Sequence, residues 1–284
     1  MEPLSQKKRK LYFISLIFVF VVLVPVTLLY SSGYRLIDGF KIVKTGGIYV
    51  GLVESSAELF LDGKLVKEIG ILKNGFFIQD LTPRVYHIIV KKDGYRSWEK
   101  VIEVLPQRVS ETSAFILPNN IPYIEVSTSS SLYDDVLGIF ATSSVNKLDY
   151  DEYPSKLATS TRENVEDVKK KGGVVLWREG DSVYASWVDN NNRAPSYFCD
   201  DGLCDKEILL NKQKVSFFDF HPQSNELVLF VINGVVLMTE IDPRIPRNEQ
   251  TLFNAVDVEI RTLGNSIFIK EPFESWYKFF EFKL

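Results

Sequence analysis

The twenty residues from Leu11 to Tyr30, LYFISLIFVFVVLVPVTLLY, carry no charged side chain. An α-helix rises about 1.5 Å per residue, so this segment would span about 30 Å, which matches the hydrocarbon core of a bilayer. Tyr12 and Tyr30 lie near its ends, where amphipathic rings prefer the headgroup layer. Pro25 is tolerated in a membrane helix. The segment therefore predicts a transmembrane helix at 11–30, which confines the chain after it to one side of a membrane.

Basic residues flank this helix on its N-terminal side, where Lys7 to Lys10 are four consecutive cations. Positive flanks stay in the cytoplasm, so we expect residues 1–10 to form a cytoplasmic stub in a plasma membrane protein. The rest would be extracytoplasmic, beginning with a juxtamembrane segment at 31–44. The alternative is a cleaved signal peptide, with Ser31 and Gly33 at the cleavage site. The apolar region of a signal peptide usually has only about 7–15 residues.

Charge and cysteine content narrow the function classes. The net charge is −4, and the cations beyond the N-terminal cluster are scattered, which argues against nucleic-acid binding. The only two cysteines, Cys199 and Cys204, flank an Asp-Gly turn sequence in the part expected on the oxidising side. They predict a local disulfide. Two cysteines with no nearby histidine cannot complete a zinc site, and we find no catalytic, metal or cofactor-binding set. The sequence thus predicts neither an enzyme nor a cofactor.

After the juxtamembrane segment, apolar and polar residues alternate with a period near two and the pattern breaks at turn residues. The Asp62-Gly63 dipeptide favours a tight hairpin, because both positions tolerate positive φ. About seven short strands in about 75 residues favour a small antiparallel β-sandwich at 45–118. The expected strands cover 48–53, 57–61, 64–69, 76–78, 85–90, 98–104 and 109–117.

The turn signals of this region follow a recognisable order. They are Ser55-Ser56-Ala57, Asp62-Gly63, the step Leu81-Thr82-Pro83-Arg84-Val85-Tyr86, and Lys92-Asp93-Gly94-Tyr95 followed by Trp98. This order resembles the PEGA domain family over about residues 45–118, although the Pro and Gly of the family's naming tetrapeptide are absent. The resemblance implies a β-sandwich of the kind found in membrane-anchored members.

The residues of this sequence that match the pattern are expected to have structural roles. Gly63 and Gly94 supply turn geometry, and Tyr86, Tyr95 and Trp98 are large aromatic side chains that pack while their polar atoms reach a partner. The functional alternative is a platform for stacking sugars, made from Tyr95 and Trp98.

The alternation stops at 119–131, where Pro-Asn-Asn-Ile-Pro and a Ser/Thr-rich tract indicate a linker. In the following segment, 132–284, we expect a short helix from Thr161 through Lys171 and then strands from Val174 onward. Residues 215–241 resemble a propeller blade, with looser copies at 173–210 and 256–284. Three copies are fewer than the four to eight blades of a closed propeller, so we expect a propeller-like domain that is partial or completed by 121–160.

Together these patterns predict a membrane-anchored cell-envelope protein of prokaryotic type, used for surface binding or structural interaction. Its partner would be an envelope protein or a surface polysaccharide. We expect residues 121–284 to carry the specificity, because they hold the irregular loops, and 45–118 to act as a rigid spacer. The alternative is an envelope hydrolase or carbohydrate-active enzyme that uses carboxylates of the distal domain such as Asp149 and Asp151.

Overall fold

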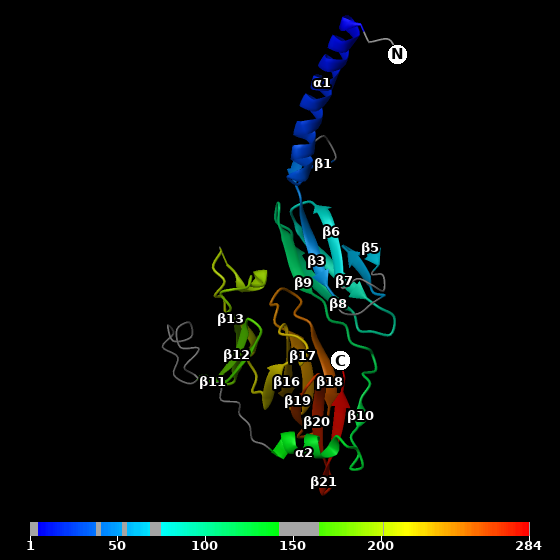
Figure 1. Cartoon of the computed structure of the whole chain (residues 1–284). Helices are drawn as coiled ribbons and strands as arrows, with labels where there is room; N and C mark the ends of the chain where they lie inside the picture. The colour runs from blue at the N-terminus through cyan, green and yellow to red at the C-terminus, as the bar shows by residue number, and fades with distance from the viewer. Residues whose placement is uncertain are drawn as a thin grey trace.

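The fold is taken from a computed structural model, which describes residues 5–37, 41–52, 56–68, 75–141, 165–200 and 202–283. The chain begins with α1 (Gln6–Ser31), a helix of 26 residues that includes Pro25. Figure 1 shows α1 projecting from a β-rich body, and none of its residues is buried. Its length and apolar composition fit a membrane span, and a signal sequence near the N-terminus would have the same features.

A small hairpin follows α1 directly and ties it to the β-rich body. Its strands, β1 (Tyr34–Ile37) and β2 (Lys41–Lys44), pair antiparallel in the juxtamembrane segment. Arg35 stacks over the ring of Tyr30, 3.6 Å from its centroid, and forms an ion pair of 2.8 Å with Asp80. The Gln107 amide donates to the carbonyl of Ser32 at 2.8 Å. The end of the helix is therefore held by side chains of the first β-rich part.

The first β-rich part consists of two sheets that enclose a shared core. Seven strands lie close to the predicted ones, and along β7 every second residue is buried, as expected for a strand with one face on a core. One sheet has the order β6-β3-β9 and the other β5-β4-β7-β8. The strands are β3 (Gly46–Gly51), β4 (Glu58–Leu61), β5 (Lys64–Glu68), β6 (Gly75–Leu81), β7 (Val85–Lys91), β8 (Trp98–Glu103) and β9 (Val109–Ser113).

The prediction of a wholly antiparallel sandwich is wrong at one pair, because β3 and β9 run parallel. The chain between them passes through all five other strands of this part and returns to β3 in the same direction. Gly46 permits this return, since a Cβ there would lie 2.3 Å from the carbonyl oxygen of Leu105. The alternation of apolar and polar residues in a sequence does not reveal the direction in which distant strands pair.

The second β-rich part contains three four-stranded antiparallel sheets, and within the described residues none closes into a barrel. Their orders are β11-β12-β13-β14, β15-β16-β17-β18 and β10-β21-β20-β19. The first sheet has β11 (Val165–Lys171), β12 (Val174–Glu179), β13 (Ser182–Trp187) and β14 (Ile208–Asn211). The second has β15 (Phe217–Phe220), β16 (Leu227–Ile232), β17 (Val235–Glu240) and β18 (Glu249–Asn254). The third has β10 (Ile124–Glu125), β19 (Glu259–Leu263), β20 (Ser266–Phe273) and β21 (Trp276–Phe282).

The helix expected through Lys171 is wrong over 165–171, which form β11, while 161–164 lie outside the described residues. The basic residues that favoured a helix contact the neighbouring sheet instead. Lys169 forms an ion pair of 2.9 Å with Asp219, and Lys171 donates to the carbonyl of His221. A helix does occur earlier, as α2 (Tyr133–Ala141), whose Val136 is buried against the third sheet.

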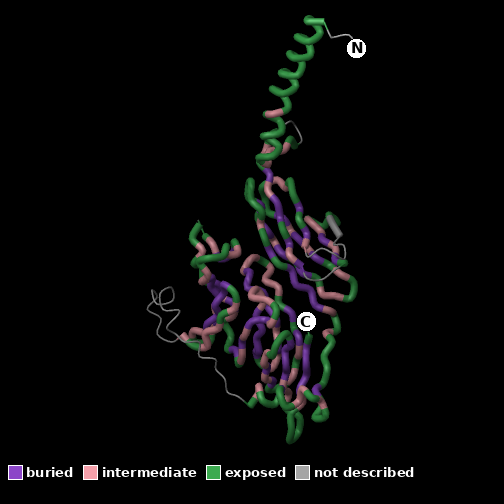
Figure 2. The backbone as a smooth tube through the Cα atoms, in the orientation of Figure 1, coloured by how far each residue is buried: buried purple, intermediate pink, exposed green. Residues whose placement is uncertain are grey.

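The predicted linker at 119–131 is packed against the second part. Residues Ile124 and Glu125 form β10 and pair with β21, which completes the third sheet. The ring of Tyr123 contacts Phe280 and Phe282, with centroids 5.3 and 5.4 Å apart. A single cluster of buried residues extends from the first part into the second, and Figure 2 shows buried backbone running through both. The two parts therefore form one packed body.

Candidate functional site

A buried ion pair joins the two β-rich parts. On β8, alternate residues Trp98, Lys100 and Ile102 are buried, so the strand's inward face carries a lysine between two apolar side chains. The Lys100 ammonium donates to the carboxylate of Glu240, which ends β17. A buried charge is tolerated when it is paired and hydrogen-bonded. Sequence reasoning did not identify Lys100 or its partner, because the two side chains are 140 residues apart in the chain.

The carboxylate of Glu240 is surrounded by donors. Trp98 Nε1 donates to Oε2 at 3.1 Å, and the backbone N–H and side-chain amide of Asn248 donate to Oε1 at 2.6 and 2.8 Å. Burial raises the pKa of Glu240, and the Lys100 charge and these hydrogen bonds oppose that rise. Burial likewise lowers the pKa of Lys100 against the attraction of Glu240. With four donors on one carboxylate, the ionised form of Glu240 is satisfied without water.

The segment after Glu240 continues the contact with the first part. Arg244 binds the Asp242 carboxylate with Nε and a terminal nitrogen and donates to the carbonyl of Glu111 on β9 at 2.8 Å. Thr112 donates to Asp242 at 3.2 Å, and the Val101 N–H donates to the carbonyl of Ile245 at 2.8 Å. The two parts are thus held together by main-chain and charge-assisted hydrogen bonds as well as apolar packing.

A cleft of about 650 Å³ lies along this interface. One wall is the segment 113–118, which begins at the last residue of β9, together with Tyr95. The other wall comes from the turn after β15 and from β16 and β17. This volume falls in the range of about 300–1,000 Å³ that is typical of ligand pockets. The lining residues are Gly51, Leu52, Tyr95, Ser113, Ala114, Phe115, Ile116, Leu117, Pro118, Pro122, Tyr197, His221, Gln223, Ser224, Glu226, Leu227, Met238, Glu240, Asp242 and Lys283.

Most polar side chains of the cleft come from the second β-rich part. The Tyr197 hydroxyl donates to Glu226 Oε1 at 3.2 Å, and burial raises the pKa of that hydroxyl. Burial, aided by the charge of Lys171, lowers the pKa of His221 to about 4, so its imidazole is neutral at pH 7. His221 Nδ1 accepts a hydrogen bond of 3.3 Å from the Gln223 N–H. This part therefore presents a carboxylate, a phenol and a neutral imidazole.

Only one of the aromatic residues singled out from the sequence reaches the cleft. Tyr95 lines it, with Lys92 Nζ 4.0 Å from its ring centroid. Trp98 is 0% exposed, so it cannot stack on a ligand together with Tyr95. Tyr86 is buried in the first part, where its hydroxyl donates to the carbonyl of Thr82 at 3.0 Å.

The predicted turn residues do not line the cleft. Asp62 and Gly63, with φ of 49° and 78°, connect β4 to β5, and Gly94, with φ of 78°, lies between β7 and β8. The carboxylate of Asp62 accepts from the His87 N–H at 3.0 Å and from Arg84 at 2.7 Å, and these bonds lower its pKa. Asp62 thus also fixes its turn to β7.

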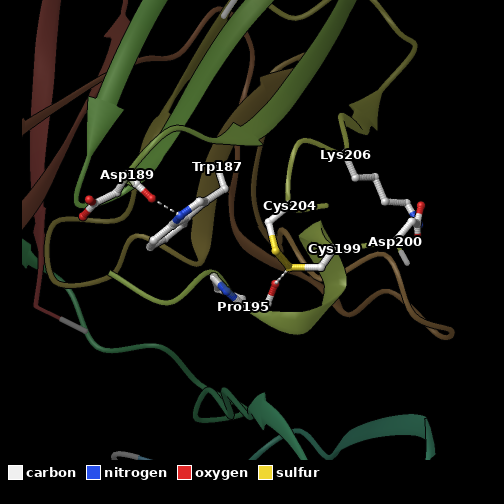
Figure 3. Close-up of a disulfide and its surroundings, with 7 residues drawn as sticks. All are labelled: Trp187, Asp189, Pro195, Cys199, Asp200, Cys204 and Lys206. Atoms are coloured by element: carbon white, nitrogen blue, oxygen red, sulfur yellow. Dashed lines mark hydrogen bonds and ion pairs between the residues drawn. A yellow bond between two sulfur atoms is a disulfide. The ribbon is translucent and has the colours of Figure 1, made fainter. Parts of the chain in front are cut away.

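Cys199 and Cys204 form a disulfide, with sulfur atoms 2.04 Å apart (Figure 3). It closes a short loop in which Asp200 and Leu203 exchange backbone hydrogen bonds, and Lys206 pairs with Asp200 at 3.2 Å. The described residues of this loop do not line the cleft.

The candidate carboxylates Asp149 and Asp151 lie outside the described residues. Within the described part of the chain, no three or more His, Cys, Asp or Glu side chains form a group that could hold a metal ion. Glu226, Glu240 and Asp242 were missed by sequence reasoning, because each also contacts a residue far away in the chain. These partners are Tyr197, Lys100 and Thr112, which are 29, 140 and 130 positions away, respectively.

No protein-family model matches this sequence, and no curated protein matches it. Among solved structures, the AfRom2 CNH domain is similar at 14% sequence identity, over 75% of this chain and 68% of that chain. Its TM-score is 0.27, which does not define a common fold.

Proposed function

We propose that this protein is a membrane-anchored cell-envelope protein whose rigid extracytoplasmic body binds a ligand in the cleft between its two β-rich parts. The observation that carries the proposed membrane anchoring is the way α1 joins that body. The helix leaves its apolar surface unburied, and Arg35, Asp80 and Gln107 hold its end against the first part. A helix of this kind is stable in a bilayer and fixes the body beside it.

Two further features support an extracytoplasmic body. The cationic residues Lys7 to Lys10 favour a cytoplasmic N-terminus, and the Cys199–Cys204 disulfide fits an oxidising compartment. In this proposal the first part is a PEGA-like sandwich, and the three four-stranded sheets are propeller-like blades. The third blade is completed by β10, which precedes the other two sheets in the chain.

The cleft supports a binding role for both parts. Its walls come from residues 113–118 and from 197–242, so the first part contributes directly to the proposed site. This differs from the expectation of a spacer, and we propose that specificity is shared by the two parts.

Introduced cysteines test the orientation, because the described part of the chain has no free thiol. Val256 is 79% exposed on the body, and Ser5 is exposed before α1. In intact cells, a membrane-impermeant maleimide should label Val256→Cys, whereas Ser5→Cys should react only after lysis. The reverse labelling would contradict the proposed orientation. Recovery of the chain in the soluble fraction with a new N-terminus at 31–34 would favour a cleaved signal peptide.

Site-specific photo-crosslinking tests the cleft as the binding site. A photoreactive amino acid at Tyr95, in the cleft, should form an adduct with the natural ligand in intact cells. The matched control is Leu65, half-exposed on β5 and outside the cleft. Adducts at position 65 with none at position 95 would show that another surface binds.

A further inference from the structure

The charges that line the cleft cancel in pairs, except at one carboxylate. Glu240 is paired with Lys100, Asp242 with Arg244, and Lys283 with Glu281 at 3.1 Å. The imidazole of His221 also lines the cleft but carries no charge at pH 7. Lys171 approaches the same turn from β11, where its ammonium donates to the carbonyls of His221 and Pro222, and it is not part of the lining.

Glu226 is the carboxylate that remains without a cation among the described residues. Its side chain accepts one hydrogen bond, from the Tyr197 hydroxyl to Oε1, which fixes the carboxylate and leaves Oε2 available. Its backbone is held as well, because its N–H donates to Ser224 Oγ at 3.1 Å and its carbonyl accepts from the Ile241 N–H at 2.9 Å. A fixed, half-buried carboxylate without a counter-charge attracts a cation.

The rest of the cleft favours an apolar molecule. The wall at 114–118 carries Phe115, Ile116 and Leu117, and Leu227 and Met238 face the cleft from β16 and β17. A mostly apolar cleft with a few polar groups on one wall is typical of sites that bind small molecules in a single orientation. A ligand with an anionic group would meet Glu226 without compensation, which is costly where water is partly excluded.

We infer that the cleft binds a small ligand with an apolar body and one protonated amine or guanidinium, and that this cation binds Glu226. The inference rests on the proposed function, in which the cleft is the binding site. The apolar body would lie along 114–118, and the Tyr197 hydroxyl would keep the Glu226 carboxylate turned toward the cation.

A pair of fluorescent probes of equal size separates charge from hydrophobicity. Dansylcadaverine is a naphthalene with a primary amine at the end of a five-carbon chain, and the N-hexyl dansylamide has a methyl group in place of the amine. We would titrate both into the full-length, detergent-solubilised protein and follow naphthalene fluorescence. The same titration into protein-free micelles of the same detergent corrects for probe in micelles. Glu226→Gln tests the carboxylate, and Glu271→Gln is a control carboxylate outside the cleft.

We expect the wild-type protein to bind dansylcadaverine at least about tenfold more tightly than the neutral probe, a difference of about 1.4 kcal/mol. Glu226→Gln should remove this preference, and Glu271→Gln should keep it. Tyr197→Phe removes the hydrogen bond to Glu226 but keeps the charge of its carboxylate, so this variant should keep part of the preference for dansylcadaverine. It therefore distinguishes the charge of Glu226 from a general disturbance of the cleft. Equal midpoints of thermal unfolding would show that the Glu226 variant is folded.

The inference would be overturned if the wild-type protein bound the two probes with equal affinity or bound neither probe. It would also be overturned if Glu226→Gln still preferred dansylcadaverine. Tighter binding of the anionic probe dansylglycine would do so as well. These outcomes do not depend on membrane orientation, so maleimide labelling and cross-linking at Tyr95 test the proposed function separately.

Discussion

The ammonium of Lys100 on β8 donates to the carboxylate of Glu240 on β17, although 140 residues separate them in the chain. Both side chains are almost completely buried, and the pair lies where the first β-rich part meets the second. Trp98, on the same strand and the same face as Lys100, donates to the other oxygen of the carboxylate. The Lys100 ammonium and the Trp98 N–H thus depend on the second part, and Glu240 would lose two of its four donors if the parts separated, which would leave an incomplete network.

Replacing Lys100 with Met should therefore destabilise the whole body. Removing one partner of a buried pair leaves an uncompensated charge and typically costs about 3–5 kcal/mol. We expect Lys100→Met to have a lower midpoint of chemical unfolding, measured by tryptophan fluorescence.

The double variant Lys100→Met with Glu240→Gln should recover part of the lost stability, because the introduced amide carries no charge and its carbonyl oxygen still accepts from Trp98. Lys64→Met, at an exposed position on β5, is the control and should change stability by less than about 0.5 kcal/mol. Wild-type stability of Lys100→Met would contradict a structural role for the pair.

His221 should make stability depend on pH between about 6.5 and 4. Its pKa falls from 6.5 in the unfolded chain to about 4 in the folded protein, mainly because of burial. Below pH 6.5 the unfolded state binds more protons, so stability falls as the pH is lowered and the loss is complete near pH 4. The full effect is about 3 kcal/mol, at about 1.4 kcal/mol per pKa unit.

The variant His221→Asn isolates this contribution, because the asparagine carbonyl can accept the Gln223 N–H in place of Nδ1. Unfolding free energies of both proteins would be measured from pH 7 to pH 4. The difference between them should shrink or reverse as the pH falls. Parallel curves would mean that His221 is accessible to protons in the folded state.

Gly46→Ala should destabilise the first part. A Cβ at this position would lie 2.3 Å from the Leu105 carbonyl oxygen and 2.8 Å from that of Arg108, and backbone atoms cannot move aside easily. We expect a loss of about 1–3 kcal/mol or a failure to fold, measured by thermal unfolding. Gly138→Ala in α2 is the matched control, since a Cβ there meets nothing within 4 Å, and alanine should stabilise the helix by up to about 1 kcal/mol. Similar unfolding temperatures for both variants would show that Gly46 is not closely packed against the connection between β8 and β9.

The disulfide should be complete in the native protein but contribute little to stability. Denatured, unreduced protein should expose no reactive thiol, and reduction should release two. In the chain-entropy model a loop this short contributes about 2 kcal/mol or less, so Cys199→Ser with Cys204→Ser should lower the unfolding temperature only modestly. A large loss would mean that the loop is part of the folding core.

Local features of the sequence were enough to predict much of the fold. The uncharged segment 11–30 predicts an apolar helix, and α1 contains it. Alternation at 45–118 predicts strands because it reports which side chains of a strand are buried, and Asp62-Gly63 carries its own turn preference. The same reasoning failed at 165–171, where acids precede bases as in a helix but the cations of β11 bind groups of the neighbouring sheet.

What the sequence determined by itself was local: an apolar helix, a set of strands and turns, and a disulfide between two nearby cysteines. Tertiary structure alone decided the parallel pairing of β3 with β9, the partner of Lys100 and the cleft with its uncompensated Glu226. Helix periodicity, strand alternation and turn preference depend on neighbours within a few residues. A buried charge pair and a cleft depend on which distant segments meet, and a single sequence carries no local signal for that choice.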